Sequence, residues 1–277
     1  MTDRYAVIGN PIDHSKSPVI HSLFAQATGQ DIEYTRVLGP LDGFADAVRA
    51  FRDAGGRGMN VTAPFKLEAF ALATEASEEA LWAGAANALR FEGERVLAEN
   101  FDGIGLARDV VQNLGLPLRG RRVLVLGAGG ATRGLLLPLI GEAPALLAIA
   151  NRTPATAQAL AAKARERARA GTEVWGGGLD EVPGPGFDLV LNATSASVSA
   201  QRPEVPDAVF GRGSVAYELA YGKGLTPFLR QALQAGAGRA VDGVGMLVEQ
   251  AAEAFAWWRG VRPATRAVID HLSVPLA

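Results

Sequence analysis

The stretch of the chain that most limits its possible fold runs from Arg121 to Asn151. An apolar run, Val123 to Leu126, has charged residues before it and glycine after it. Such a run is typical of a strand buried on both faces, as in a parallel sheet. The glycine-containing segment 127–134 follows, and residues 135–140 are then apolar enough for a buried helix. A strand, a glycine turn and a helix in this order predict the first half of a dinucleotide-binding unit.

The glycine turn contains residues suited to a bound pyrophosphate. Gly127 permits the tight turn, and Gly129 lets the backbone approach the phosphates. The free N–H groups of the following helix would then face the negative charge. The third glycine of the usual G-x-G-x-x-G pattern is replaced by Thr132. This motif alone therefore leaves cofactor binding and an ordinary strand–helix turn both open.

The next strand favours cofactor binding and indicates which cofactor. Residues 146–150 form a second apolar run, which ends in Asn151-Arg152-Thr153. NAD enzymes place an acidic residue at this strand end, against the ribose 2′-hydroxyl, whereas an arginine accommodates a 2′-phosphate. No acid stands here, so the sequence favours NADP over NAD. The alternative is that Arg152 is a solvated charge at the start of a loop.

Length and composition indicate two domains and exclude several kinds of site. The 277 residues, 48% of them hydrophobic and 20% charged, suit two domains with full cores. A net charge of −2 provides no basic surface for nucleic acid. Cysteine is absent, which removes disulfides and thiol nucleophiles. The three scattered histidines, His14, His21 and His271, argue against a metal site.

The sequence contains no pattern typical of export or of membrane insertion. Residues 1–9 are short for a signal peptide, and Asp3 and Arg4 interrupt them. No apolar run reaches the ~18 residues that a membrane-spanning helix needs. We therefore expect a cytoplasmic protein that binds a small molecule, without a membrane or nucleic-acid partner, as a monomer or homodimer.

Two serines precede a predicted helix near the N-terminus. Ser17 stands before Pro18, which is typical of a helix start with a capping hydroxyl and a proline at the first helical position. Capping by Ser17 would leave Ser15 with little influence on the helix. Two hydroxyls and a lysine at a helix N-terminus would also suit a carboxylate or phosphate. The pattern leaves capping and anion binding both open.

Four polar residues stand out in apolar or turn-forming surroundings. Lys66 follows a short strand and a proline turn, so its amine could project into a cleft. Asn87 is the one polar residue in the uncharged stretch 83–89, and backbone groups could satisfy its amide. Asp102 could be no more than a helix cap, and Gln250 is an isolated amide on an apolar helix. Solvated or structural roles stay open for all four.

The remaining patterns predict an α/β chain with a domain boundary within residues 102–119. Apolar runs and periodicity predict strands at 5–9, 32–38, 188–192 and 214–219, and a hairpin at 89–98. Helical spacing predicts helices at 41–54, 104–114, 154–170, 243–258 and 263–272. The glycines and prolines of 176–186 indicate a surface loop.

Taken together, these motifs resemble the shikimate dehydrogenase family over essentially the whole chain. The matching segments are Gly9-Asn10-Pro11, His14 to Pro18, Asn60 to Lys66, Ala83 to Asn87, Asn100 to Gly103, Gly127 to Ala131, Asn151 to Thr153, Asn192 to Ser195, and Asp242 to Val248 with Gln250. Their shared order and compatible spacing are far more specific than any single motif.

The resemblance implies an α/β fold of two domains around a cleft. A substrate domain would comprise residues 1–103 with 243–277, and a Rossmann-type NADP-binding domain residues 104–242. The implied reaction is the reversible reduction of 3-dehydroshikimate to shikimate by NADPH, with Lys66 and Asp102 as catalytic residues. By position, the implied substrate contacts are Ser15, Ser17, Thr62, Asn87, Asp102, Tyr221 and Gln250. The implied cofactor contacts are Gly127, Ala128, Gly129, Gly130, Ala131, Asn151, Arg152, Thr153, Thr194, Leu219 and Gly243.

The chain departs from the family pattern at a few positions. Phe101 stands where the family usually has Thr, and Ala88 follows the amide where Thr is common, which leaves the shape of the pocket open. Thr156 replaces a second arginine and weakens the case for tight 2′-phosphate binding. Two alternative functions are a paralogue acting on quinate or a related hydroxy acid, and a non-catalytic NADP-sensing protein. The presence of both Lys66 and Asp102 argues against the second.

Overall fold

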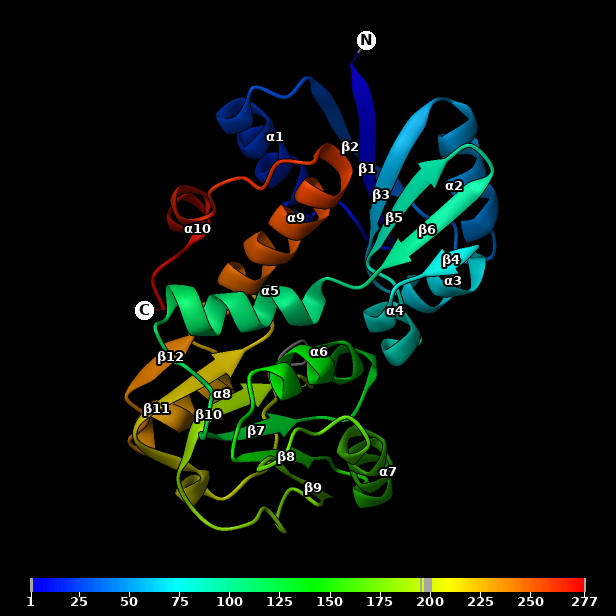
Figure 1. The fold of residues 1–277 in the computed structure, drawn as a ribbon. Helices are drawn as coiled ribbons and strands as arrows, with labels where there is room; N and C mark the ends of the chain where they lie inside the picture. Colours follow the sequence, from blue (N-terminus) through cyan, green and yellow to red (C-terminus); the bar gives the residue numbers. More distant parts are fainter. Residues whose placement is uncertain (1, 195, 197–200, 277) are drawn as a thin grey trace. The chain divides into compact units, whose positions relative to one another are not determined.

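The computed structural model describes residues 2–194, 196 and 201–276, which divide into two compact α/β units. Unit 1 consists of residues 1–105 with 248–270, and unit 2 of residues 106–247 with 271–277. Within the described residues, each unit is built on one six-stranded sheet (Figure 1). The predicted fold class, an α/β protein with two domains, is confirmed. Ser195, the last residue of one matching motif, lies outside the described residues.

The sheet of unit 1 is mixed, with parallel pairs at both edges and antiparallel pairs between them. Its strand order is β2-β1-β3-β5-β6-β4, with β1 parallel to β2 and β3, and β5 antiparallel to β3 and β6. The strands are β1 (Asp3–Gly9), β2 (Ile32–Leu38), β3 (Gly56–Val61), β4 (Glu75–Ala76), β5 (Ala88–Glu92) and β6 (Arg95–Glu99). The strand predicted at 32–38 and the hairpin predicted at 89–98 are both present.

Side chains alternate along these strands, so the two faces of the sheet pack against different helices. On one face, Ile8 and Met59 share a buried cluster with residues of α2 and α3. On the other face, α1 packs against β1 and β2, and Tyr5 stacks on Trp258 of α9. The helices are α1 (Ser17–Thr28), α2 (Phe44–Asp53), α3 (Lys66–Leu72), α4 (Glu78–Ala83), α9 (Val244–Arg259) and α10 (Arg266–Leu272).

The sheet of unit 2 is parallel throughout and has the strand order β12-β11-β10-β7-β8-β9. Its strands are β7 (Arg122–Leu126), β8 (Leu146–Ala150), β9 (Glu173–Gly177), β10 (Phe187–Asn192), β11 (Phe210–Glu218) and β12 (Arg239–Val241). Counted from β7, this is the order 3-2-1-4-5-6 of the doubly wound dinucleotide-binding fold. The order reverses between β7 and β10, which places the expected ligand crevice at the carboxyl ends of these two strands.

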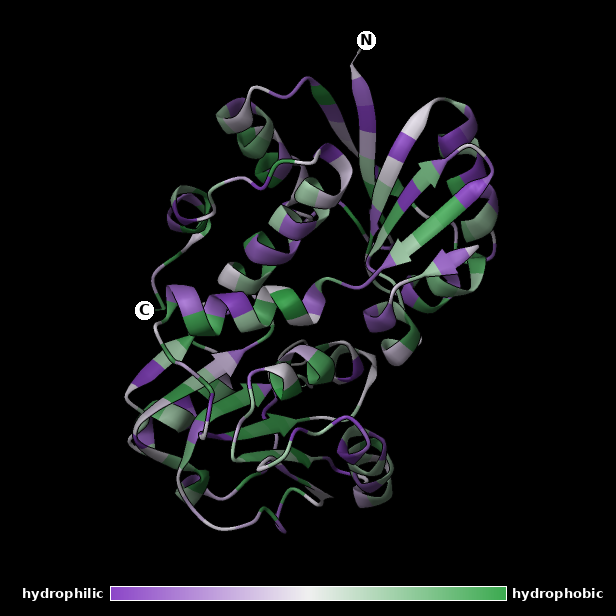
Figure 2. Ribbon diagram, viewed as in Figure 1, coloured by the Kyte–Doolittle hydropathy of each residue, from purple (hydrophilic) through white to green (hydrophobic). Residues whose placement is uncertain are grey.

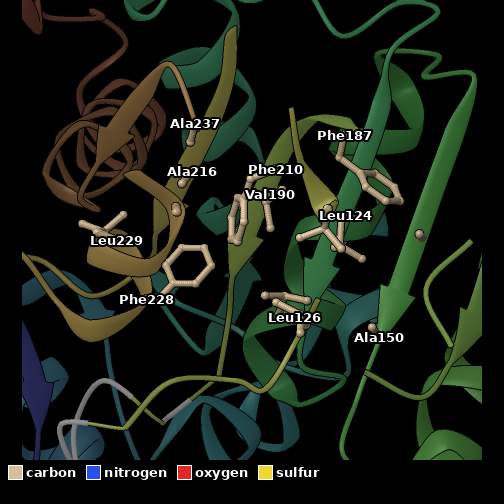
Figure 3. Packing of buried hydrophobic residues seen from close by; sticks show 14 of the residues in the cluster. Leu124, Leu126, Ala150, Phe187, Val190, Phe210, Ala216, Phe228, Leu229 and Ala237 are labelled. Atoms are coloured by element: carbon tan, nitrogen blue, oxygen red, sulfur yellow. The ribbon is translucent and has the colours of Figure 1, made fainter. Parts of the chain in front are cut away.

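The core of unit 2 lies between this sheet and its helices. Leu124 and Leu126 of β7 and Val190 of β10 share a cluster with Phe228 and Leu229 of α8 (Pro227–Gln234), as Figure 3 shows. The central strands β7, β8 and β10 are largely hydrophobic along their length (Figure 2). Burial of each such Leu or Phe side chain contributes roughly 1.5–3 kcal/mol. Two further helices, α6 (Gly130–Gly141) and α7 (Pro154–Arg165), follow β7 and β8.

The structure corrects two sequence predictions. Residues 176–186 are not entirely a loop, because Gly176 and Gly177 end strand β9. A Cβ on Gly176 would lie 2.4 Å from the backbone oxygen of Ala157, so this glycine allows α7 to approach the sheet closely. The helix predicted at 104–114 is α5 (Asp102–Arg108) followed by a π-helix over Asp109–Asn113. Among the described residues, no helix has both the length and the apolar character needed to cross a membrane.

Candidate active site

Lys66 lies where a strand of unit 1 turns into a helix. Strand β3 ends at Val61, and Lys66 is the first residue of α3. Its Nζ donates a hydrogen bond to Oδ2 of Asp102 at 2.5 Å. The side chain of Lys66 is 33% exposed and that of Asp102 is 12% exposed. The ammonium group is therefore paired with a carboxylate and remains accessible to a small ligand.

Asn87 connects this ion pair to helix α9. Its Nδ2 donates to Oδ1 of Asp102 at 2.8 Å and to Oε1 of Gln250 at 3.1 Å. Its Oδ1 accepts the backbone N–H of Phe101 at 2.9 Å. Asn87 is 2% exposed, and both its amide nitrogen and its amide oxygen make hydrogen bonds. Two of the three partners are side chains, so backbone groups alone do not satisfy the amide. We call Lys66, Asn87, Asp102 and Gln250 the lysine cluster.

Asp102 is held at the start of α5 by its own backbone as well as by its side chain. Its N–H donates to Oδ1 of Asn100 at 3.2 Å, and Nδ2 of Asn100 donates to the backbone oxygen of Ala85 at 3.0 Å. Asn100 is 2% exposed. Sequence reasoning assigned Asn100 no role, although its place two residues before a candidate carboxylate was a usable signal.

Phe101 points into the core of unit 1. It is 7% exposed and forms a cluster with Ala88 and Ala254, and its ring lies edge-on to Trp257 with centroids 5.8 Å apart. The two departures from the family pattern at positions 88 and 101 therefore pack against each other in the core.

The helix predicted after the two serines is present, but its cap differs from the prediction. Helix α1 begins at Ser17 itself, and its N-cap residue is Lys16. The hydroxyl that meets the helix start is that of Ser15, which accepts the N–H of Ser17 at 3.3 Å. Capping by Ser17 was therefore wrong, because the first turn starts one residue earlier than the proline suggests, at Lys16. The Lys16 side chain makes no cap hydrogen bond, and the Ser15 hydroxyl only accepts the first N–H of the helix. Both serines are buried, at 7% and 6% exposure.

The other two implied substrate contacts lie in different units. Thr62 follows β3 in the turn that leads to Lys66, and its N–H donates to the backbone oxygen of Ile8 at 3.0 Å. Tyr221 belongs to unit 2, where it follows β11, and burial raises the pKa of its hydroxyl. The structure thus brings together the lysine cluster, while the part of Tyr221 in substrate binding stays a prediction.

A cavity of about 1050 Å³ lies in unit 2. Nine of the eleven implied cofactor contacts line it: Gly127, Ala128, Gly129, Gly130, Ala131, Asn151, Arg152, Thr153 and Thr194. Leu179, Gln201, Arg202, Glu204 and Pro227 also line it and were missed by sequence reasoning. Leu179 follows β9, a strand that the sequence did not reveal, and the others come from segments without a recognisable motif.

The glycine turn at this cavity has the geometry that its sequence predicts. Gly127 has φ +103°, a conformation that favours glycine, and a Cβ there would lie 3.2 Å from Ala193 and Thr194 at the end of β10. Thr132, which replaces the third glycine, is fully buried and donates its hydroxyl proton to the backbone oxygen of Gly127 at 2.8 Å. The threonine therefore closes the turn with a hydrogen bond of its own.

The charges at the cavity favour an anion at the end of β8. Two arginines, Arg152 and Arg202, line the cavity with one carboxylate, that of Glu204. The two remaining implied contacts, Leu219 and Gly243, do not line the cavity. They lie against each other, since a Cβ on Gly243 would be 2.2 Å from the backbone oxygen of Leu219.

These two sites define the class of the protein. A doubly wound sheet with a glycine turn and an arginine at the second strand end suits a phosphorylated dinucleotide. A lysine paired with a carboxylate suits proton transfer to a substrate oxygen. A chain that carries both is a dinucleotide-dependent oxidoreductase that acts on a carbonyl or hydroxyl group.

Comparison with known proteins narrows this class. The family model "Shikimate dehydrogenase substrate binding domain" matches residues 7–89, and "Shikimate 5'-dehydrogenase C-terminal domain" matches residues 243–272. The shikimate dehydrogenase (NADP(+)) of Nitrosospira multiformis is 53% identical over 272 residues, which cover 98% of each chain. The chain belongs to the shikimate dehydrogenase family.

Solved structures show the same similarity. An Ael1 enzyme from Pseudomonas putida is 58% identical, with both chains fully covered and a TM-score of 0.94. Shikimate 5-dehydrogenase from Thermus thermophilus, in complex with NADP(H) and shikimate, is 31% identical, with 97% of this chain and 98% of that chain covered and a TM-score of 0.82.

Proposed function

We propose that this protein catalyses the reversible reduction of 3-dehydroshikimate to shikimate by NADPH, a step of aromatic amino-acid biosynthesis. The observation that carries the proposal is the lysine cluster, found in a chain of the shikimate dehydrogenase family. Residues 1–103 with 243–277 form the proposed substrate domain, and residues 104–242 the proposed NADP domain.

Lys66 is the proposed acid–base residue. Bound NADPH supplies a hydride to the carbonyl carbon of the substrate. The Lys66 ammonium donates a proton to the carbonyl oxygen, which takes up the electron pair of the C=O bond. In the direction of oxidation, the neutral amine accepts the hydroxyl proton. A positive charge at this position also stabilises the alkoxide that develops on the substrate oxygen.

Asp102, Asn87 and Gln250 orient the substrate ring and the lysine. Asn87 donates to Oδ1 of Asp102 and Lys66 donates to Oδ2, which fixes the orientation of the carboxylate. The lone pairs that remain on these oxygens therefore have fixed directions. Carboxylate and amide oxygens accept the protons of ring hydroxyls, and Thr62 adds a further hydroxyl. Such positioning supports catalysis by holding the reacting carbon and oxygen near the lysine.

Ser15 and Ser17 bind the substrate carboxylate, with help from Tyr221. Hydroxyl groups donate charge-assisted hydrogen bonds to a carboxylate, and the start of α1 adds the partial positive charge of a helix N-terminus. A carboxylate is the chemical feature that distinguishes this substrate from a neutral sugar or polyol.

The cavity of unit 2 is the proposed NADP site. The glycine turn and the N-terminus of α6 suit the pyrophosphate, and the Arg152 guanidinium suits the 2′-phosphate. Leu219 and Gly243 remain proposed cofactor contacts. Thr156 supplies no positive charge, so Arg152 is the main source of the NADP preference.

The test is a steady-state assay of the purified protein with two substrates and two cofactors. NADPH or NADH formation is followed with shikimate or quinate as substrate, and the Lys66→Ala variant provides the background rate. We expect kcat/KM to be highest for shikimate with NADP⁺, by at least about tenfold over each other combination. Quinate turnover as fast as that of shikimate, or activity equal to the Lys66→Ala background, would contradict the proposal.

A further inference from the structure

Two buried polar side chains lie beside residues of the unit 2 cavity and have no part in the proposed reaction. Asn192 ends β10 and Glu218 ends β11, and the two residues are partners in the register of these strands. Nδ2 of Asn192 donates to Oε2 of Glu218 at 3.0 Å, and both residues have 0% exposure. The bond therefore joins the carboxyl ends of two adjacent strands, at the edge where a doubly wound sheet binds its ligand.

The bond to Glu218 fixes the direction of the Asn192 amide. The amide nitrogen is a donor and the amide oxygen is an acceptor. With its nitrogen at the carboxylate, Asn192 uses Oδ1 to accept the backbone N–H of Thr194 at 3.1 Å and the hydroxyl proton of Thr194 at 2.7 Å. The reverse orientation would set the amide NH₂ against the N–H of Thr194 and the amide oxygen against the carboxylate. Glu218 therefore selects the orientation that holds Thr194.

Thr194 is left with one hydrogen-bonding position for a ligand. It lines the cavity, and its hydroxyl proton is used by Asn192. Its Oγ1 also accepts the backbone N–H of Ala196 at 3.3 Å, so one lone pair remains on this oxygen. The Thr194 hydroxyl can therefore accept a hydrogen bond from a ligand but cannot donate one. Such a group suits an O–H or N–H of the ligand rather than a phosphate oxygen.

We propose that Glu218 is a positioning residue for the cofactor, an inference that rests on the NADP site proposed above. Through Asn192, Glu218 makes the Thr194 hydroxyl an acceptor for a ribose hydroxyl or an amide N–H of the dinucleotide. Glu218 itself is not one of the residues that line the cavity, so it acts only through its neighbours. The phosphates of the cofactor are then left to the glycine turn and to Arg152.

The glycine turn holds the other side of Thr194. A Cβ on Gly127 would lie 3.2 Å from Cγ2 of Thr194 and equally close to the backbone of Ala193. The N–H of Ala193 donates to the backbone oxygen of Leu126 at 2.9 Å, which ties this segment to the end of β7. The Thr194 side chain is thus fixed at its methyl group by the turn and at its hydroxyl by Asn192. Loss of the Asn192 bonds would leave only one of these two restraints.

Glu218 also has a structural role, which a test must separate from positioning. Oγ1 of Thr226 donates to Oε2 of Glu218 at 3.2 Å and accepts the N–H of Leu229 at 3.3 Å, which caps α8. Removing the carboxylate therefore lowers stability whether or not it positions Thr194. The stability of a Glu218 variant alone is no measure of the proposal, and affinity for the cofactor is the required measurement.

The first test compares Glu218→Ala with Asp109→Ala. Asp109 is the matched control because it is 2% exposed, belongs to the same unit and does not line the cavity. It also accepts the same kinds of donor, the hydroxyl of Tyr217 at 2.7 Å and Nδ2 of Asn113 at 2.9 Å. We expect Glu218→Ala to raise the Kd for NADPH about 5- to 20-fold and Asp109→Ala to leave it within about twofold, while both lower the melting temperature. Fluorescence titration without substrate measures the Kd, and equal values in the two variants would overturn the inference.

A double-mutant cycle shows whether Glu218 acts through Thr194. Thr194→Val removes the hydroxyl and keeps the shape of the side chain. It should raise the Kd for NADPH about 5- to 20-fold, and adding Glu218→Ala should then change the Kd by less than about twofold. An equal increase from Glu218→Ala in both backgrounds would overturn the inference. A wild-type protein that does not bind NADPH would instead overturn the proposed NADP site, so the two failures are distinguishable.

Glu218→Gln provides a second route should Glu218→Ala fail to fold. Asn192 and Thr226 both donate to the same oxygen of Glu218, so the single oxygen of a glutamine can accept both bonds. We therefore expect Glu218→Gln to bind NADPH within about twofold of wild type, in contrast to Thr194→Val. A Kd for Glu218→Gln as high as that of Thr194→Val, or a normal Kd in Thr194→Val, would overturn the inference.

Discussion

Asn87 and Asp102 are joined by a hydrogen bond of 2.8 Å in which the amide donates to the carboxylate oxygen that Lys66 leaves free. Lys66 holds the other oxygen, so the Asp102 carboxylate has a donor on each side. The same amide reaches Gln250 on α9. A carboxylate fixed in this way can direct both a lysine and a substrate hydroxyl without rotating.

Replacing Asn87 by Ala should therefore impair catalysis more than binding of the cofactor. The change removes the donor to Asp102 and the acceptor for the N–H of Phe101, both of which are buried. We expect kcat to be about 10- to 100-fold lower and stability about 1–3 kcal/mol lower. Asn113→Ala is the control, because Asn113 makes a similar bond to Asp109 in unit 2 at 2.9 Å. Equal kcat values in the two variants would contradict the role of Asn87.

Replacing the two serines should affect stability in the opposite order to the one that the sequence suggests, with the larger loss at Ser15 rather than at Ser17. Ser15→Ala should lower stability by roughly 0.5–1 kcal/mol, because Ser15 accepts the N–H of the first residue of α1. Ser17→Ala should lower stability less than Ser15→Ala does, because the Ser17 hydroxyl caps no N–H of the helix. Both should raise the KM for shikimate, since a lost charge-assisted bond is worth ~1.5–3 kcal/mol. Melting temperature and KM are the measurements, and a normal KM in both variants would reject carboxylate binding.

Arg152 should determine the preference for NADP. Arg152→Ala is expected to lose about 1.5–3 kcal/mol of NADPH affinity and almost none of NADH affinity. Arg169→Ala is the control, because Arg169 is an exposed arginine of the same unit that does not line the cavity. Dissociation constants from fluorescence titration measure both effects. Equal losses for the two cofactors would assign Arg152 a structural role.

His21 should make the stability of the protein depend on pH below neutrality. Burial lowers its pKa to about 3 from an ordinary 6.5, so the folded protein resists protonation while the unfolded chain accepts it. The contribution of neutral His21 to the free energy of unfolding is complete above pH 6.5. It is lost as the pH falls from 6.5 towards 3, by up to roughly 1.4 kcal/mol per pH unit. His21→Gln cannot titrate, so its free energy of unfolding should fall less steeply between pH 6 and 4. Parallel pH profiles for the two proteins would contradict the burial of a neutral His21.

Much of unit 2 could be predicted from the sequence because its signals are local. The β7 and β8 strands are continuous apolar runs, and the glycine turn between them needs only neighbouring residues. Strand β9 and the close approach of Gly176 to α7 could not be predicted. Gly176 and Gly177 look like loop residues in the sequence, which does not show that α7 packs against them. The β12 strand, of three residues, is too short to show a pattern.

The lysine cluster could be predicted only as a set of candidates. Its members are spread along the sequence from Lys66 to Gln250. Residue patterns alone left a solvated or structural role open for each of them. The family resemblance singled them out, and the structure gives their distances. The hydrogen bond from Tyr34 of β2 to Asn60 of β3 depends on the register of β1, β2 and β3, which no local pattern specifies.

The central claim is that Lys66 transfers the proton, and the most direct test is the kcat of Lys66→Ala with shikimate and NADP⁺. Loss of a general acid–base group should lower kcat by about 10²–10⁴-fold, with KM for shikimate little changed. A circular dichroism melt confirms that the variant is folded under the assay conditions. A kcat within a few-fold of wild type in the folded variant would contradict the assignment.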